Sequence, residues 1–151
     1  MPKGDGLNSY NGFTPQQRGR ALRWLRTQQE AGLRTRPSRC DACGETEGVI
    51  DSHSEDYREP FGDHIGRFGL CYRCHMMLHC RFSHPEAFKA YERQVAAGVR
   101  FPPMGGRDWR RFKAEHLEAC FNEPLELEVH QSLLADIAAG KYRPHGSTDS
   151  S

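Results

Sequence analysis

The chain has 151 residues, a formal net charge of +1 and 36% hydrophobic residues, so it has room for one domain with a modest core. No stretch approaches the roughly 18 consecutive apolar residues of a membrane span, and the first residues lack the apolar run of a signal peptide. We therefore expect a cytoplasmic, intracellular protein that does not contact a membrane. In a reducing compartment its six cysteines are more often metal ligands or buried thiols than disulfides.

Composition divides the chain into five segments. Residues 1–12 are rich in Gly, Asn and Ser and are expected to form a flexible leader, and residues 141–151 a disordered tail. Between these ends we expect a basic helix and arm over 13–38, a cysteine-rich core over 39–82 and a helical extension over 83–140.

The first helix is expected to begin after Thr14. Thr14 fits the N-cap, Pro15 the first helical position and Gln17 a capping box, and Gly32 is typical of the position where a helix ends. The segment 18–39 that contains this helix is strongly basic and has Glu30 as its one acidic residue. Its arginines form either a solvated surface or a surface that meets phosphate.

Residues 39–82 are expected to form a small α+β core, with helices on both sides of it. The stretch "GVIDSHSEDY" contains a short strand pattern and residues 68–71 contain another, so the two can form a β-hairpin. A helix is expected to follow directly after the second strand.

Four cysteines of this core have the spacing of a metal site. Cys40 and Cys43 form "CDACG", and Cys71 and Cys74 form "CYRC". Each Cys-x-x-Cys unit can wrap one side of a tetrahedral ion, and Gly44 suits the tight turn after the first pair. The pattern predicts a structural zinc that orders a segment with few apolar residues.

Three histidines predict a second ion. His75 and His79 are four positions apart on the expected helix, so both imidazoles project from one face, and His53 lies at the end of the first expected strand. Three neutral imidazoles leave coordination positions open to water and substrate, which is typical of a catalytic metal site. The candidate ions are Mg, Mn, Ni and Zn.

Together, "CDACG", "VIDSHSEDYREP" and "GLCYRCHMMLH" resemble the HNH nuclease family, the His-Me finger or ββα-metal group, in its subtype with a four-cysteine zinc. The resemblance covers residues 40–79. It implies a hairpin and a helix that hold a divalent ion at the scissile phosphate. His53 matches the ligand at the strand end, and His75 and His79 match the ligands on the helix. The implied activity is endonucleolytic hydrolysis of phosphodiester bonds in DNA.

The residue after His53 departs from this pattern. The family has a histidine general base there, and this chain has Ser54, which is a poor proton acceptor near neutral pH. His64, in the turn between the strands, could serve as the base, or the ion could activate water without one. Of two nearby carboxylates, Asp56 is favoured over Glu55 as a catalytic residue, because alternate strand residues face opposite sides.

Basic side chains near these motifs are candidates for contact with the phosphates of DNA. The candidates are Arg18, Arg23, Arg26, Arg34, Arg36, Arg39, Arg73 and Arg81. A second basic and aromatic cluster combines Trp109 with its neighbours Arg107, Arg110 and Arg111.

The helical extension is expected to begin in "SHPEAFKAYERQVAAG", with Ser83 or His84 as the cap, Pro85 next and Gly98 at the end. Further helices are expected over about 108–121 and 127–139. The acidic residues of this region could pack on the basic first helix or meet a protein partner. Packing, rather than a special role, is expected for the remaining candidates, Cys80, His116, Cys120 and His130.

Two functions from different classes remain. The first is a metal-dependent HNH-like endonuclease that acts on DNA, and the second is a catalytically inactive, zinc-binding HNH-like protein that binds nucleic acid or a protein partner. Ser54 favours the second. DNA is the expected partner, with RNA or a protein as alternatives. A transcription-type zinc finger is disfavoured because no helix shows the base-reading spacing of that class.

Overall fold

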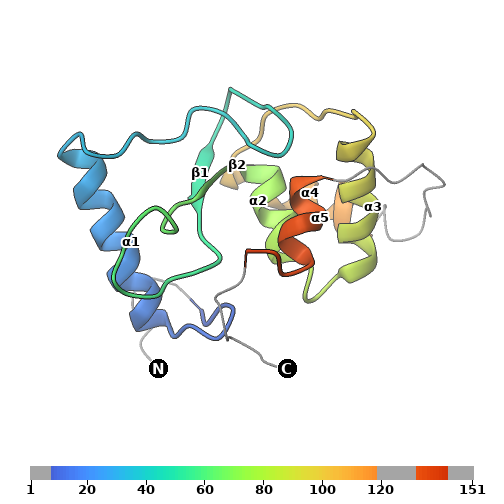
Figure 1. The fold of residues 1–151 in the computed structure, drawn as a ribbon. Helices are drawn as coiled ribbons and strands as arrows, with labels where there is room; N and C mark the ends of the chain where they lie inside the picture. Colours follow the sequence, from blue (N-terminus) through green and yellow to red (C-terminus); the bar gives the residue numbers. More distant parts are fainter. Residues whose placement is uncertain (1–7, 119–131, 143–151) are drawn as a thin grey trace. The chain divides into compact units, whose positions relative to one another are not determined.

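The computed structural model of the chain describes residues 8–118 and 132–142 (Figure 1). In chain order its elements are α1 (Pro15–Glu30), β1 (Ile50–His53), β2 (Phe68–Cys71), α2 (Tyr72–His79), α3 (Pro85–Ala96), the 3-10 helix η1 (Gly106–Asp108), α4 (Trp109–Phe112), the π-helix η2 (Lys113–Glu118) and α5 (Leu133–Ala138). The strands β1 and β2 pair in one antiparallel sheet. The predicted α+β class, with a hairpin followed by a helix, is confirmed.

The chain forms two compact units. The first comprises the described residues of Met1–Arg36, Ser52–Phe68 and Tyr142–Ser151, and the second comprises those of Pro37–Asp51 and Gly69–Lys141. These units do not follow the segment boundaries expected from composition, because the segment 39–82 contributes to both.

Helix α1 has the ends that its sequence predicts. The Thr14 hydroxyl accepts a hydrogen bond from the Gln17 amide at 3.1 Å, and the Gln17 side chain accepts one from the Thr14 amide at 2.8 Å. Two backbone donors that a helix start leaves unpaired are thereby satisfied. The helix buries Ala21 and Leu25 in the core of the first unit. The remaining buried members of that core are Tyr10, Phe13, Tyr57 and Ile65.

Within the leader expected over 1–12, the described residues 8–12 include one partner of a β-bridge. Tyr10 and Phe13 pair through their backbones, with N···O distances of 3.0 and 2.9 Å, and both side chains are buried. Burial of a side chain of this size stabilises the fold by about 1.5–3 kcal/mol. The polar composition of the leader concealed this one aromatic anchor, and residues 1–7 lie outside the described residues.

The second unit is built around α2, which contacts α3 and α5 (green, yellow and red in Figure 1). Helix α3 begins at Pro85 and is followed by Gly98, as its sequence predicts. Buried apolar side chains of this unit include Leu70, Met77, Leu78, Phe88, Tyr91, Val95, Met104, Phe112, Leu117, Leu134 and Ile137.

The two later helices are only partly comparable with prediction. Residues 106–118 are helical, in consecutive 3-10, α and π turns, where one helix over 108–121 was expected. Helix α5 lies inside the helix expected over 127–139. Residues 119–131, with Cys120 and His130, lie outside the described residues. Among the described helices, none has the length and apolar character needed to cross a membrane.

Candidate metal centres

Four cysteines of the second unit come together. Cys40 and Cys43 lie on the loop before β1, Cys71 ends β2 and Cys74 lies in the first turn of α2. Their sulfur atoms all lie within 4.8 Å of one another. Cys40, Cys71 and Cys74 are buried. The structure thus confirms the predicted cysteine cluster.

Local backbone geometry directs these sulfurs inward. The Cys43 amide donates to the Cys40 sulfur at 3.4 Å, and the Cys74 amide donates to the Cys71 sulfur at 3.5 Å. The first turn needs Gly44, whose φ of +85° is in the left-handed region that favours glycine. The two Cys-x-x-Cys turns therefore present their thiols in the same way.

Gly69 brings the two turns together. Its amide donates to the Asp41 carboxylate at 2.8 Å, and its carbonyl accepts from the Asp41 amide at 2.7 Å. A Cβ atom at this position would lie only 2.7 Å from the Pro37 side chain. Close approach of the first cysteine loop to β2 therefore requires glycine here.

The spacing of the sulfurs suits a tetrahedral ion. Two sulfurs bound to zinc at about 2.3 Å lie about 3.8 Å apart in tetrahedral geometry, and the Cys43 and Cys71 sulfurs are 3.7 Å apart. Hydrogen bonds from Cys43, Cys71 and Cys74 lower the pKa of the Cys40 thiol, and hydrogen bonds with Cys40 raise the pKa of the Cys71 and Cys74 thiols. Ionisation of one thiol thus opposes that of the others, and a divalent ion offsets this repulsion. The cluster could hold a metal such as zinc.

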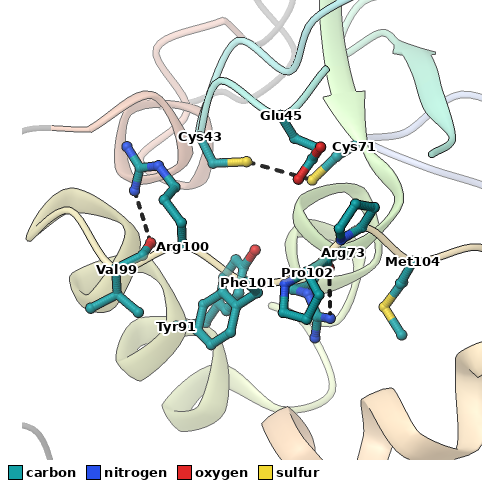
Figure 2. Close-up of a pocket in the computed structure, with 11 residues that line it drawn as sticks. Cys43, Glu45, Cys71, Arg73, Tyr91, Val99, Arg100, Phe101, Pro102 and Met104 are labelled. Carbon is teal, nitrogen blue, oxygen red and sulfur yellow. Dashed lines mark hydrogen bonds between the residues drawn. The ribbon is translucent and has the colours of Figure 1, made fainter. Parts of the chain in front are cut away.

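Aromatic and basic side chains lie beside this cluster (Figure 2). The Tyr91 hydroxyl of α3 is 3.1 Å from the Cys74 sulfur, and burial raises the pKa of Tyr91, which keeps this hydroxyl protonated and able to donate. Arg73 donates to the Pro102 carbonyl at 3.2 Å, and its guanidinium lies 5.1 Å from the Phe101 ring centre. With an exposed fraction of only 4%, Arg73 supports the fold.

The two histidines of α2 face each other. The Nε2 atoms of His75 and His79 are 3.2 Å apart, and each side chain is partly exposed. On its other side, the His75 ring donates from Nδ1 to the Asp51 carboxylate of β1 at 3.0 Å. Sequence reasoning missed Asp51, although a carboxylate two positions before His53 on the same strand was visible in the printed sequence.

His53 belongs to the first unit and has partners of its own there. Its Nε2 is 2.6 Å from the Glu55 carboxylate, and both side chains are buried. The Tyr10 hydroxyl donates to the same carboxylate, and the Asn11 amide donates to it at 2.7 Å. Sequence reasoning missed Tyr10 and Asn11, since they lie more than forty residues before Glu55.

Of the two carboxylates after His53, the structure gives Glu55, and not the favoured Asp56, the described contact with His53. Asp56 pairs with Arg58 at 3.1 Å, at the surface, whereas Glu55 contacts His53. Strand alternation was the basis of that preference, but β1 ends at His53, and the chain beyond it no longer alternates between two faces. The grouping of His53 with His75 and His79 around one ion stays a prediction.

Ser54 and His64 both bond to backbone groups of the loop between the strands. Ser54 is buried, and its hydroxyl accepts a hydrogen bond from the Gly66 amide at 2.6 Å. His64 Nε2 lies 2.7 Å from the Arg58 carbonyl, to which it donates. Ser54 therefore braces this loop.

The predicted phosphate-binding arginines separate into two groups. Arg18 is buried, with its guanidinium 5.2 Å from the ring centres of both Tyr10 and Tyr57, so we assign it to the packing of the first unit. Arg34 is partly buried and donates to the Gly62 and Ile65 carbonyls. The exposed members are Arg23, Arg26, Arg36 and Arg39.

Arg81 follows α2 and is partly exposed. It donates to the Leu78 carbonyl at 3.0 Å, and its guanidinium lies 4.3 Å from the ring centre of Phe82, which is 64% exposed. Arg107, Arg110 and Arg111 are also exposed, near Trp109.

Comparisons with protein family models, with curated proteins and with solved structures give no match for this chain.

Proposed function

We propose that the protein is a metal-dependent endonuclease of the HNH type that hydrolyses phosphodiester bonds in DNA. In this proposal Cys40, Cys43, Cys71 and Cys74 hold a structural zinc, and His53, His75 and His79 hold a second divalent ion. The observation that carries the proposal is the facing pair of imidazole nitrogens on α2, which begins at the cysteine cluster.

The spacing of this pair supports a ligand role. Two nitrogens bound at about 2.0–2.1 Å to a tetrahedral ion lie about 3.3 Å apart, close to the 3.2 Å between the Nε2 atoms of His75 and His79. Metal-binding histidines usually donate their other ring N–H to a carboxylate, which orients the ring and fixes its tautomer. Asp51 accepts from His75 in this manner.

The position of His53 on β1 supports its role as a third ligand. His53 stands two residues after Asp51 on β1, and alternate residues of a strand project from the same face. Because Asp51 points at His75, we place His53 on the face of the strand that serves the ion. Three histidines would leave coordination positions for water and for a phosphate oxygen.

The bound ion would act as a Lewis acid on the phosphodiester. The residues of the chain hold and orient it: His53, His75 and His79 as ligands, and Asp51 through the ring of His75. Ser54 is committed to the Gly66 amide, so a base from the chain must come from elsewhere. His64 remains the proposed base, since donation from Nε2 leaves Nδ1 able to accept a proton.

The exposed arginines support DNA as the partner. Arg23, Arg26, Arg36 and Arg39 are exposed, and each phosphate that they neutralise should steepen the salt dependence of binding by about 0.9 in a plot of log affinity against log salt. The double variant Arg23→Gln and Arg26→Gln should flatten this slope for duplex DNA. An unchanged slope would show that these arginines do not contact phosphate. Stronger binding to RNA than to DNA would make RNA the proposed substrate.

Plasmid nicking in the presence of magnesium, manganese, nickel or zinc tests the proposal. The parent protein should nick DNA with at least one of these ions, and His75→Ala should remove the activity while the folded state persists. The matched control is His84→Ala, because the His84 side chain makes no capping hydrogen bond to α3 and its described hydrogen bond is to the neighbouring Ser83 hydroxyl. Nicking by His75→Ala at the parent rate would contradict the ligand role.

One observation favours the second candidate, a catalytically inactive zinc-binding protein. The buried Ser54 braces a loop at the position where the family has its base. An inactive parent with zinc held tightly in both centres would support this alternative. Ser54→His cannot decide the question, because the larger side chain would replace a buried hydrogen bond and overpack the site.

A further inference from the structure

The Glu55 carboxylate stands at the centre of a buried network in the first unit. Its Oε1 accepts from the Asn11 side chain at 2.7 Å. Its Oε2 accepts from the Tyr10 hydroxyl and lies 2.6 Å from His53 Nε2. Glu55 and His53 are each 2% exposed. A buried carboxylate with this many partners has a defined position, because losing any one partner would leave a buried polar group unpaired.

The network determines which ring nitrogen of His53 carries the proton. The Tyr10 hydroxyl and the Asn11 amide both donate to the Glu55 carboxylate, so we take this group as an acceptor for His53 Nε2 as well. In a neutral imidazole the other nitrogen then has no proton. The lone pair on Nδ1 is therefore the one that His53 can offer to an ion.

The N-terminal turn is shaped to hold this carboxylate. Asn11 adopts a φ of 53°, a left-handed conformation that asparagine tolerates better than most residues. Its side-chain amide donates to the Glu55 carbonyl at 3.2 Å as well as to the carboxylate. Tyr10 is anchored by its backbone bridge to Phe13, and its ring meets the His53 ring edge-on at 5.7 Å.

We propose that Glu55, held by Tyr10 and Asn11, is a positioning residue that orients His53 and fixes the tautomer in which Nδ1 is the ligand atom. This inference rests on the proposed second ion and adds to it a carboxylate and two residues from the N-terminal turn. By analogy with other metal centres, loss of such an outer partner weakens metal binding or activity by about 10–100-fold.

Three substitutions test the network, each with a different loss. Glu55→Gln removes the charge and adds a donor, Tyr10→Phe removes one hydroxyl, and Asn11→Gly removes the amide without straining the positive φ. Glu59→Gln is the control for an exposed carboxylate, with a side chain 61% exposed. Tyr57→Phe is the control for a buried tyrosine of the same core.

Two measurements on the full chain provide the readouts. The ¹⁵N chemical shifts of the His53 ring identify the protonated nitrogen in protein loaded only with the structural zinc. Competition with a chelator gives the affinity for the second ion, while elemental analysis verifies that the structural zinc is retained. Thermal unfolding of every variant separates weaker ion binding from loss of fold.

In the neutral His53 ring of the parent we expect the proton on Nε2 and none on Nδ1. Glu55→Gln should populate the other tautomer and lower the affinity for the second ion by about 10–100-fold. Tyr10→Phe and Asn11→Gly should lower this affinity less. The controls Glu59→Gln and Tyr57→Phe should leave both the His53 tautomer and the ion affinity unchanged.

A neutral His53 ring with its proton on Nδ1 in the parent, or parent affinity in a folded Glu55→Gln, would overturn the positioning role while leaving the proposed function intact. If Glu55→Gln does not fold, parent affinity and an unchanged His53 spectrum in Tyr10→Phe and Asn11→Gly would overturn it instead. A parent that binds no second ion would contradict both the proposed function and the ligand role of Nδ1.

Discussion

Removal of the zinc proposed for the four-cysteine cluster should unfold the second unit. Zinc binding contributes about 10–16 kcal/mol to the folding of zinc-finger peptides, whereas the net stability of a whole domain is about 5–15 kcal/mol. All four cysteines belong to the second unit, and their loops contain few buried apolar side chains. The free energy of unfolding of this unit is therefore expected to fall to about zero without the ion.

Cys71→Ser isolates this effect. Cys71 is the N-cap of α2, where its sulfur accepts from the Cys74 amide. Serine is among the preferred N-cap residues, so the substitution removes a proposed metal ligand and preserves the cap. The matched control is Cys80→Ser, because Cys80 is partly exposed, follows the same helix and lies outside the cluster.

The two tryptophans of the chain allow each unit to be followed separately. Trp24 packs on the core of the first unit, and Trp109 stacks on Phe112 in the second, with ring centres 5.2 Å apart. In a Trp24→Phe background, Cys71→Ser or a zinc chelator should shift Trp109 fluorescence to that of the unfolded chain. In a Trp109→Phe background, Trp24 should change less. Complete loss of zinc, measured by elemental analysis, with an unchanged Trp109 melting curve would refute this reasoning.

Three further outcomes are expected. Ser54→Ala leaves the partly buried Gly66 amide without its acceptor and should lower the free energy of unfolding in urea by about 1 kcal/mol. Thr14→Ala removes the N-cap of α1 and should lower it by about 1 kcal/mol. Asp51→Asn removes the carboxylate that accepts from His75. It should lower the affinity for the proposed second ion by about 10–100-fold in a chelator competition, with the proposed structural zinc retained.

Exposed positions supply the controls for these three variants. Ser38→Ala, Thr35→Ala and Asp63→Asn make the same chemical changes at the surface and should have small effects. If Ser54→Ala or Thr14→Ala unfolds at the same urea concentration as its control, the corresponding hydrogen bond does not stabilise the fold. Equal ion affinity in Asp51→Asn and Asp63→Asn would show that Asp51 does not orient His75.

Features encoded within a few residues of each other were predictable. The capping box of α1, the start of α3 at Pro85, and the strands β1 and β2 all follow from local spacing, as does the pairing of His75 with His79 on one helix face. The cysteine cluster was also predictable, because each Cys-x-x-Cys turn is a local structure and one ion needs both turns.

Contacts between residues from distant parts of the chain were not predictable from the sequence. Glu55 lies against Tyr10 and Asn11, and a polar N-terminal segment contains no periodicity that would indicate this contact. Burial of Arg18 and Arg73 was likewise not predictable, since the local sequence does not distinguish an arginine that contacts phosphate from one that packs on an aromatic ring inside the protein.

Local sequence patterns were enough to predict the secondary structure of the core and the types of ligand available, because capping, strand alternation and cysteine spacing act over a few bonds. Folding of the whole chain was needed to show which carboxylates contact the histidines and which arginines are exposed. Those choices depend on the packing of segments far apart in the chain, where a buried charge must find a partner in space rather than in sequence.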